Sequence, residues 1–527
     1  MPEGAGLWRL RYALTVVCSL LCCGRMNCNA ALLLWRTAHT SGADDRPAIV
    51  ERDAVVDYAG LRSRAAAVAA ALTAAGAGPD RPVAIFLERG CDAAAAFFGT
   101  LAIGGIAVFI NETLRPRQID HILAHSGARH LITTADLLAR QPRAPQGDAH
   151  IIDVATIPAG GDEAGASLPV RRLGDDVAQI IYTSGSTGQP KGVTVTHANI
   201  EAAARTVVGY LGISASDRIA SLLPFSFVYG LSQLLCAVTA GATLVVERSP
   251  LPQQAVATVR DQDVTVLAAV PALWMRLLAT GGLGNALLPV LRVMTNAGGH
   301  LPLEAVRRLR AAQPHVRLFL MYGLTEALRS TYLLPEEVDR RPDSIGRAIP
   351  GTEIFVVRDD GTLAEPGEVG ELVQRGPTVT LGYWKDPQLT AQVFRPNPVR
   401  PEGAPDAQRA VYSGDLVRCD EDGFLYFVSR KDRIIKTMGF RVGPDEVADV
   451  LLASGEVAEA AVTGEPDPQW GERIVAHVVL VSGGSVERLK VYCGRELPRH
   501  LQPARFEVRE AMPLLPSGKH DVAALRA

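Results

Sequence analysis

The stretch that decides the fold is Tyr182–Val193, with the sequence YTSGSTGQPKGV. It begins at the end of Val177–Tyr182, an apolar run typical of a buried strand, and it ends in Pro-Lys-Gly around Lys191. Glycines let the backbone approach an anion closely, while hydroxyl and free N–H groups bind phosphate oxygens. The stretch is not a Walker loop, because Gly192 follows the lysine in place of Ser or Thr. We predict a phosphate-binding loop, since a flexible linker rarely follows a buried strand directly.

Strand-like and helix-like segments alternate on both sides of this loop. Arg81–Leu87 is strand-like and precedes it, and Ala198–Leu211 is helix-like and follows it. Such βα repetition predicts parallel sheets covered by helices. After Pro342, frequent Gly and Pro with hairpin-like runs predict a small β-barrel, and a last short α/β unit begins beyond Arg433. The predicted fold class is α/β: a large N-terminal domain of two βα subdomains plus a small β-barrel, followed by a small α+β C-terminal domain.

Composition excludes several classes of protein. The chain has 527 residues, of which 53 are Lys or Arg and 56 are Asp or Glu, so its formal net charge is −3. This balance gives no electrostatic reason to bind nucleic acid or an acidic membrane. A hydrophobic content of 48% argues against a mainly disordered chain, and eight cysteines are too few for a disulfide scaffold of this length. We predict a cytoplasmic globular protein that binds neither nucleic acid nor membranes.

Residues 1–31 do not fit this pattern. Arg9 and Arg11 precede an apolar run, Tyr12–Cys23, which is similar to a signal peptide or a short anchor. The run is shorter than the roughly 20 residues of a transmembrane helix. Met26 is an alternative start of the protein, because a domain-like pattern begins soon after it. We therefore interpret residues 1–31 as either a leader or a spurious extension.

The glycine-rich stretch resembles the signature loop of the adenylate-forming (AMP-binding) superfamily, which includes acyl-CoA synthetases, adenylation enzymes and luciferases. The resemblance runs from about residue 32 to the C-terminus. Further motifs stand in the order of that family: NAGGHLP at 296–302, MYGLTEA at 321–327, YSGDLV at 412–417, SRKDRIIK at 429–436 and LPSGK at 515–519. The resemblance implies an N-terminal AMP-binding domain at 32–431 and a mobile C-terminal domain at 432–527, which turns about Asp432.

The resemblance gives these motifs roles in binding and activating a nucleotide. It makes Lys519 the catalytic residue that stabilises carboxylate attack on the α-phosphate, because a fixed positive charge stabilises developing negative charge. Thr325 would contact phosphate and Glu326 would bind Mg²⁺, which prefers carboxylate oxygens. A helix cap is the alternative role for both residues. The other implied nucleotide-binding residues are Thr183, Ser184, Gly185, Ser186, Thr187, Gly188, Lys191, Gly298, Tyr322, Asp415, Arg430 and Lys436.

The enzyme implied by the resemblance is an acid–thiol ligase. A carboxylic acid and MgATP would give an acyl-adenylate and pyrophosphate, and CoA would then take the acyl group as a thioester. The alternative is a stand-alone adenylation enzyme that loads an acyl or amino acid onto the phosphopantetheine of an acyl carrier protein. The same residues serve both reactions, so both acceptors stay open.

The acyl pocket is expected around Phe227, Val228, Asn296 and Gly323. Amino-acid-activating members of the superfamily have an Asp at the position of Val228, and an apolar side chain cannot pair with an ammonium group. An apolar or aryl acid is therefore the expected substrate. The run MYGLTEALRSTYLLPEEVDRRPDSIG, residues 321–346, is similar to acyl-CoA ligases associated with exosortase systems, which have Asp where this chain has Val228.

Overall fold

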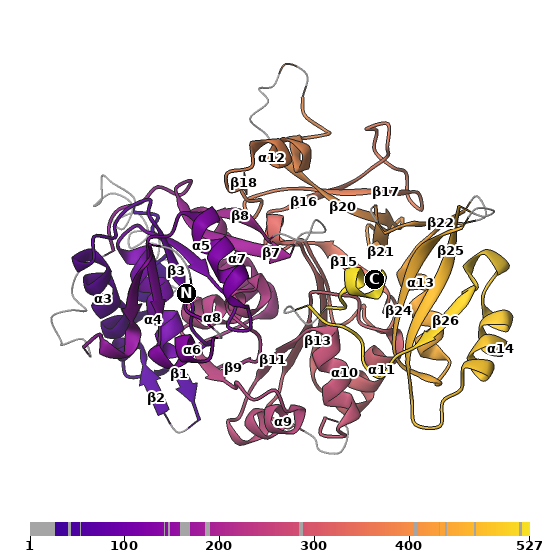
Figure 1. Ribbon diagram of the computed structural model, residues 1–527, viewed down its shortest axis with the longest axis horizontal. Coiled ribbons are helices and arrows are strands. Elements are labelled where there is room, and N and C mark those ends of the chain that lie inside the picture. The colour runs from indigo at the N-terminus through magenta and orange to yellow at the C-terminus, as the bar shows by residue number, and fades with distance from the viewer. Residues whose placement is uncertain are drawn as a thin grey trace, which may run out of the picture.

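The computed structural model confirms a mixed α/β fold with a large N-terminal and a small C-terminal domain (Figure 1). The structure describes residues 27–39, 44–52, 54–141, 143–145, 148–158, 169–184, 190–283, 288–401, 403, 409–431, 433–437, 440–467, 471–515 and 519–526. Within these ranges, no helix has the length and hydrophobicity needed to cross a membrane. The expectations that lie outside the described residues concern the leader up to residue 26, Gly185, Ser186, Thr187, Gly188, Asp432 and the side chains of Ser184 and Lys436.

Seven strands form the first sheet of the N-terminal domain. In spatial order they are β18 (Gly382–Tyr383), β8 (Pro190–Thr196), β7 (Val177–Ser184), β4 (Ile106–Phe109), β3 (Pro82–Ile85), β5 (His130–Thr133) and β6 (His150–Asp153). The strands from β7 to β6 are parallel, as expected for βα units. β8 runs antiparallel to β7, so the glycine-rich stretch lies in a hairpin. This hairpin differs from the sequence expectation, which had no strand between the loop and the helix at Ala198.

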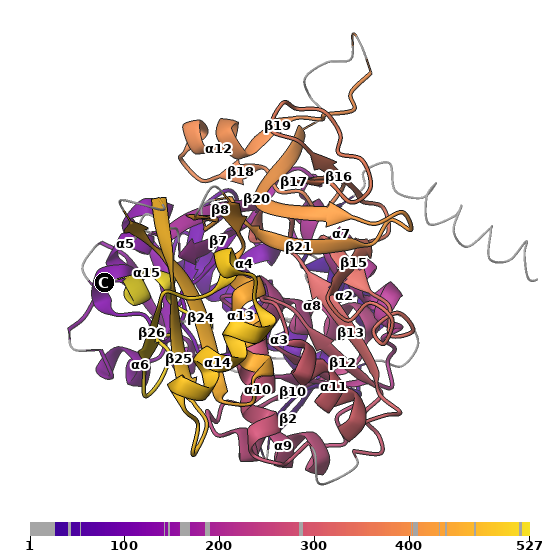
Figure 2. The same cartoon turned by 90° about the vertical axis from the view of Figure 1, so that its right-hand side faces the viewer.

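A second sheet of fourteen strands changes from parallel to antiparallel pairing. Its parallel part is β13 (Arg317–Tyr322), β12 (Val293–Asn296), β11 (Val266–Ala269), β9 (Arg218–Ser221), β10 (Thr243–Val246) and β1 (Pro47–Glu51), edged by the antiparallel β2 (Ala54–Asp57). Beyond β13 the antiparallel strands are β14 (Thr331–Leu333), β15 (Ser344–Ala348), β21 (Leu425–Arg430), β20 (Arg409–Cys419), β17 (Val369–Arg375) and β16 (Glu353–Val357), with β19 (Phe394–Pro396) beside β20. The hairpins after Pro342 thus extend this sheet, at the top of the molecule in Figure 2.

Apolar side chains join the two sheets into one core. Helices α3 (Tyr58–Ala74), α4 (Cys91–Ala102), α7 (His197–Leu211) and α8 (Val228–Ala240) bury their apolar residues there. A second apolar cluster contains residues of the second sheet and of α9 (Pro252–Asp261), α10 (Pro271–Ala279) and α11 (Leu303–Ala312). These cores hold the carboxyl ends of the parallel strands, where loops of α/β folds bind ligands.

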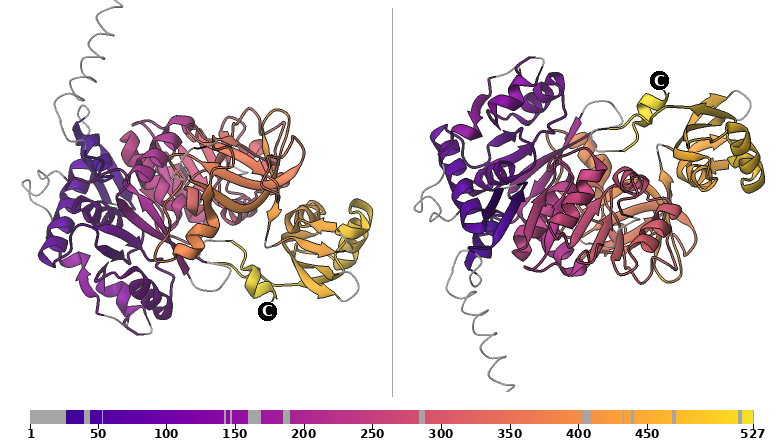
Figure 3. Two further views of the ribbon diagram at one scale, coloured as in Figure 1. Left: turned by 90° about the horizontal axis from the view of Figure 1, so that it is seen from above. Right: turned by 90° about the horizontal axis from the view of Figure 1, so that it is seen from below.

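The C-terminal domain has an apolar core of its own. Its sheet has the order β23 (Phe440–Val442), β22 (Ile435–Thr437), β25 (Gly471–Leu480) and β24 (Val457–Asp467), with β26 (Arg505–Val508) beside β25. Helices α13 (Pro444–Ala453) and α14 (Val486–Glu496) pack on this core. Figure 3 shows the domain at one end of the molecule, with the final helix α15 (Val522–Arg526) turned back toward the large domain.

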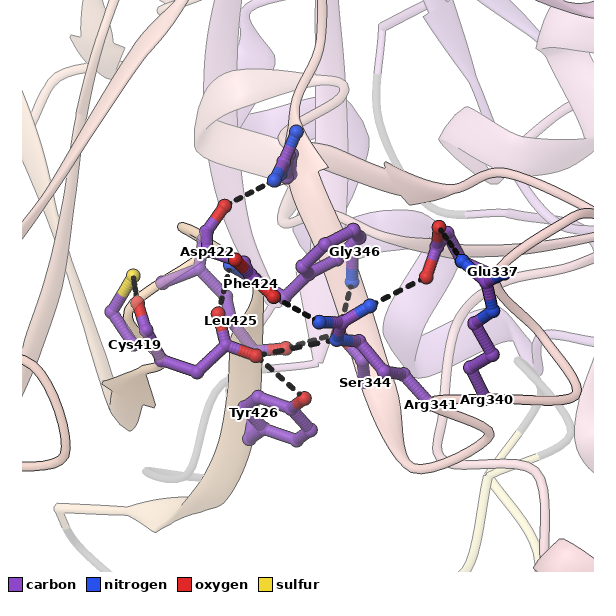
Figure 4. Close-up of polar contacts among 12 residues, drawn as sticks. Glu337, Arg340, Arg341, Ser344, Gly346, Cys419, Asp422, Phe424, Leu425 and Tyr426 are labelled. Atoms are coloured by element: carbon purple, nitrogen blue, oxygen red, sulfur yellow. Dashed lines mark hydrogen bonds and ion pairs between the residues drawn. The ribbon is translucent and has the colours of Figure 1, made fainter.

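An arginine network holds the turn between β20 and β21 (Figure 4). Arg341 lies 2.6 Å from Glu337 and 3.4 Å from Asp420, and it also pairs with Asp422 in the turn. Its guanidinium lies over the ring of Phe424, 4.2 Å from the centroid. The network therefore fixes one end of the β20–β21 hairpin. The other end of this hairpin contributes Asp415 and Arg430 to the candidate site.

Residues 27–31, which the expected boundary assigns to the leader, pack into the N-terminal domain. Asn29 is buried and donates hydrogen bonds to the carbonyls of Leu101 (2.7 Å) and Val170 (2.9 Å). The N–H of Ala30 donates to Nδ1 of His197 at 3.0 Å. Because these bonds satisfy buried polar groups, these residues contribute to the folded domain.

Candidate active site

The two ends of the glycine-rich stretch belong to the paired strands β7 and β8. In the antiparallel register Thr183 lies opposite Lys191, and Ser184 lies opposite Pro190. Thr183 and Lys191 are half-buried, and the loop at 185–189 lies outside the described residues. Because directly opposed residues of a hairpin are neighbours, the two side chains lie together at the base of the expected phosphate loop.

The MYGLTEA motif at 321–327 begins at the end of β13 and continues beyond it. The strand ends at Tyr322, and a short 3₁₀ turn, η3 (Thr325–Ala327), carries Glu326. The hydroxyl of Tyr383 donates to Glu326 Oε1 at 2.5 Å. Burial and the charge of Glu326 raise the pKa of Tyr383, so the hydroxyl keeps its proton and orients the carboxylate. A carboxylate has further acceptor capacity, which suits the hard cation Mg²⁺.

Asp415 and Arg430 face each other on the β20–β21 hairpin. They are register partners, and Nη1 of Arg430 lies 3.1 Å from Oδ1 of Asp415. The hydroxyl of Tyr322 donates a short hydrogen bond to Oδ2 of Asp415. Burial raises the pKa of Asp415, while Arg430 and the Tyr322 hydroxyl oppose the rise. Oδ1 is buried and makes no well-aligned hydrogen bond, so it can accept one from a ligand such as a ribose hydroxyl. These residues fit a nucleotide.

Lys519 reaches this site from the C-terminal domain. A β-carbon placed on Gly298 would lie 4.0 Å from Cε of Lys519, so the lysine stem passes over the turn after β12. Desolvation lowers the pKa of Lys519. The charge of Asp415 raises this pKa, and the charges of Arg433 and Arg430 lower it further. The residue as a whole is nevertheless exposed. Both observations agree with an ammonium group that protein atoms surround on several sides while the site stays open to solvent.

The turn after β12 has a conformation that favours glycine. Gly298 has φ +85°, and a β-carbon there would lie 3.4 Å from Cγ1 of Val270. Nδ2 of Asn296 donates to the carbonyl of Gly299 at 3.2 Å, while Oδ1 of Asn296 is buried without a partner. A side chain at position 298 would strain the backbone and crowd the lysine. The turn therefore leaves backbone accessible beside Lys519, at one of the residues expected to bind the nucleotide.

The same turn contacts the C-terminal domain through His300. Nε2 of His300 lies 3.1 Å from Oδ2 of Asp449 on α13. Desolvation lowers the pKa of His300, but the hydrogen bond and charge of Asp449, together with Asp445 and Asp343, raise it overall. Sequence reasoning assigned no role to this histidine, and the structure makes it a link between the domains.

A mostly apolar pocket lies between α7, α8 and the β7–β8 hairpin. Its cavity volume is about 30 Å³, and it opens to solvent. Its wall consists of Gln179, Ile181, Val195, Ile200, Ala203, Ala204, Val207, Val228, Leu231, Ser232, Leu235, Leu328 and Arg329. Of the four expected pocket residues, only Val228 belongs to this wall. Phe227 precedes α8, and Asn296 and Gly323 lie at the ends of β12 and β13.

Sequence reasoning missed Ser232, Arg329 and Tyr383. Ser232 stands four residues after Val228, a spacing that puts both on one face of a helix and was available as a signal. Arg329 follows the MYGLTEA motif closely, and a charge in that apolar context was a second signal. For Tyr383, which lies 57 residues from its partner Glu326, the sequence contains no comparable local signal.

Comparison with known proteins agrees with this geometry. Two family models match the chain: AMP-binding enzyme at residues 34–384, and AMP-binding enzyme C-terminal domain at residues 446–519. The chain is 30% identical to the long-chain-fatty-acid–CoA ligase FadD13 of Mycobacterium tuberculosis, over 89% of this chain and 92% of that one. It is 34% identical to CymA of Salinispora arenicola, a probable nonribosomal peptide synthetase, over 91% of this chain but only 6% of that much longer protein.

A solved structure has the same arrangement over nearly the whole chain. It is the o-succinylbenzoate CoA synthetase MenE of Bacillus subtilis in complex with the acyl-adenylate intermediate OSB-AMP. The TM-score is 0.80 and the sequence identity 27%, over 94% of this chain and 98% of that one. Since the first family model alone spans more than half of the residues, the chain belongs to the AMP-binding enzyme family.

Proposed function

We propose that this protein is an ATP-dependent acid–thiol ligase, which activates a carboxylic acid as an acyl-adenylate and then transfers the acyl group to CoA. The observation that supports it best is that Lys519 of the C-terminal domain lies beside Gly298 of the N-terminal domain, close enough for the charges of Asp415, Arg430 and Glu326 to act on it. A protein that only bound a nucleotide would not need a lysine delivered by a second domain. The similarity to FadD13 and MenE, both named as CoA-ligating enzymes, supports the same reaction.

In the first step a carboxylate oxygen of the acid attacks the α-phosphorus of ATP. The bond from this phosphorus to the bridging oxygen breaks, and pyrophosphate leaves. Negative charge grows on the α-phosphate oxygens, and the Lys519 ammonium would stabilise it from a fixed position. Asp415 and Arg430 would hold the ribose, and Thr183, Thr325 and Lys191 would contact phosphate. Mg²⁺, held by Glu326, would supply neutralising charge to the phosphates. No protein nucleophile is needed, because positioning carries the reaction.

In the second step a thiolate sulfur attacks the carbonyl carbon, the C–S bond forms, and AMP leaves with the carboxyl-derived oxygen. Lys519 is then no longer needed, and a turn of the C-terminal domain at Asp432 would withdraw it and admit the thiol. CoA is the proposed acceptor. The phosphopantetheine of a carrier protein is the second candidate, favoured by the similarity to CymA. ATP and CoA are both available in the cytoplasm, which is the proposed location.

The test is a pyrophosphate-release screen over fatty, aryl and amino acids, with MgATP and with CoA present or omitted. We expect release with apolar or aryl acids and thioester formation only with CoA. Lys519→Ala is expected to lose adenylate formation but to convert a supplied acyl-adenylate to thioester. Lys490→Ala, which alters an exposed lysine on α14 of the same domain, is the matched control. Absence of release with every acid would reject the function, and retained adenylate formation in Lys519→Ala would reject the role of this lysine.

A further inference from the structure

Arg329 is a buried cation that the reaction as described does not use. The residue is 5% exposed. It follows Leu328, whose φ of +53° lies in the left-handed region, and the N–H of Arg329 donates back to the carbonyl of Ala327 at 2.5 Å. A bulky residue adopts such a conformation only where the surrounding structure imposes it. The tight turn directs the arginine side chain away from the motif at 321–327 and toward α8.

The guanidinium is only partly satisfied by the protein. Nη2 donates to Oγ of Ser232 at 2.5 Å, Nη1 lies 3.3 Å from the carbonyl of Leu328, and the group lies over the ring of Tyr229, 5.2 Å from its centroid. Nε is buried without a hydrogen-bond partner. No carboxylate among the described residues lies within 4.0 Å of it. A buried guanidinium without a counter-ion is unfavourable, so a ligand that supplies a negative charge would stabilise this state.

Arg329 is also the only charged residue in the wall of the apolar pocket that contains Val228. The main chain at Arg329 lies beside the nucleotide motif, since a β-carbon on Gly323 would lie 3.3 Å from Cα of Arg329. The guanidinium, in contrast, contacts Ser232 and Tyr229 on α8. A substrate that fills this pocket would therefore have its reacting carboxylate near the nucleotide and its far end near the cation.

We propose that Arg329 is the counter-ion of a second carboxylate on the substrate, so that the acid activated here is a dicarboxylic acid with an apolar body. This inference rests on the proposed function and adds the substrate class to it. The pocket would widen to take the apolar body of the acid, Lys519 would serve the carboxylate that reacts, and Arg329 with Ser232 would bind the carboxylate that does not. A planar guanidinium suits this task because it can donate two parallel hydrogen bonds to a carboxylate.

The test compares matched acids with one or two carboxyl groups: hexanoate with adipate, and benzoate with its dicarboxylic analogues. The wild-type protein is expected to use the diacid with at least a 10-fold higher kcat/KM for pyrophosphate release. Arg329→Met, which keeps an unbranched apolar stem and removes the charged end, is expected to reverse the preference mainly through KM, while Arg329→Lys keeps part of it. The thermal midpoint of the wild-type protein should rise with the diacid and not with the monoacid.

The possible outcomes separate this inference from the proposed function. Turnover of monoacids without a preference for diacids in the wild-type protein would overturn the inference and leave the ligase function intact. A diacid preference that survives in Arg329→Met would also overturn it. If Arg329→Met does not fold, Arg329→Lys and the wild-type preference decide the question. Failure of every acid to release pyrophosphate, together with no thermal shift by diacids, would reject both proposals.

Discussion

His300 and Asp449 connect the two domains, and we predict that their ion pair favours the orientation in which Lys519 reaches the nucleotide site. His300 follows the turn that Lys519 covers, and Asp449 lies 3.1 Å away on α13 of the C-terminal domain. A turn of the C-terminal domain about Asp432 would separate the two side chains. Asp449→Asn tests the contact, because it removes the charge and nearly preserves the size.

The contact depends on pH because it needs a protonated histidine. Desolvation lowers the pKa of His300, but Asp449, with Asp445 and Asp343, raises it above its ordinary value. Desolvation by the surrounding protein raises the pKa of Asp445, although the residue is exposed, and His300 and Arg433 act against that rise. Since the histidine pKa is raised by the pair, the stabilisation is complete below the ordinary value of about 6.5 and is lost as the pH rises through the raised value.

The size of the effect follows from the exposure of the pair. The His300 side chain is 30% exposed and the Asp449 side chain 42% exposed. Solvent therefore screens the pair, and an interaction of about 0.5–1 kcal/mol is expected. This free energy corresponds to about a 2- to 5-fold change in the ratio of the two domain orientations. We expect Asp449→Asn to slow adenylate formation by this factor near pH 6 and to have little effect at a pH about two units higher.

The assay is ATP–pyrophosphate exchange across this pH range, with His300→Gln and the double variant completing a mutant cycle. Asp339→Asn is the matched control, since its partner Arg310 lies 2.8 Å away within the N-terminal domain. The reasoning is refuted if the ratio of wild-type to Asp449→Asn rates is the same at every pH. Additive effects of the two single substitutions would refute it equally.

Three further outcomes are expected. Because desolvation lowers the pKa of Lys519, adenylate formation should decline as the pH rises through a value below the ordinary lysine pKa, and the residual activity of Lys519→Arg should lack this decline. Gly346→Ala should unfold at a clearly lower temperature than Gly361→Ala: both glycines have positive φ, but only at Gly346 would a β-carbon meet a backbone oxygen, 2.0 Å away. Trp274→Ala should lower the free energy of unfolding in urea by about 3–5 kcal/mol, because this side chain is fully buried.

Local sequence patterns were sufficient to predict the strand before the glycine-rich loop and the helix after it. The predicted strand Val177–Tyr182 and helix Ala198–Leu211 agree with β7 and α7 to within two residues at each end. β8 was missed because Pro190 and Gly192 are typical of turns. Only the pairing of this segment with β7 and β18 makes it a strand, and such pairing is a tertiary effect that local propensity does not contain.

Motif order predicted most of the candidate site but not its hydrogen bonds. Asp415 and Arg430 were both expected to bind the nucleotide, and the hairpin register explains why they lie opposite each other. The bond from Tyr383 to Glu326 was not predictable, because Tyr383 lies in β18 of the first sheet, Glu326 lies in a turn after β13 of the second, and the two share no local pattern. Arg329 was overlooked for a related reason: an arginine is ordinarily exposed, and its burial depends on how α8 packs against the motif.

Val228 and Arg329 together change what the apolar pocket can exclude. Val228 is apolar and offers no partner to an ammonium group. Arg329 in the same wall carries a positive charge and would repel an ammonium group. An acid with an ammonium group at its far end would lose the hydration of that group beside a guanidinium that has no carboxylate within 4.0 Å among the described residues. An Asp at position 228 would put a carboxylate in the wall that contains Arg329. We expect the two side chains to pair with each other, so that Val228→Asp alone would not provide a free carboxylate for an ammonium group.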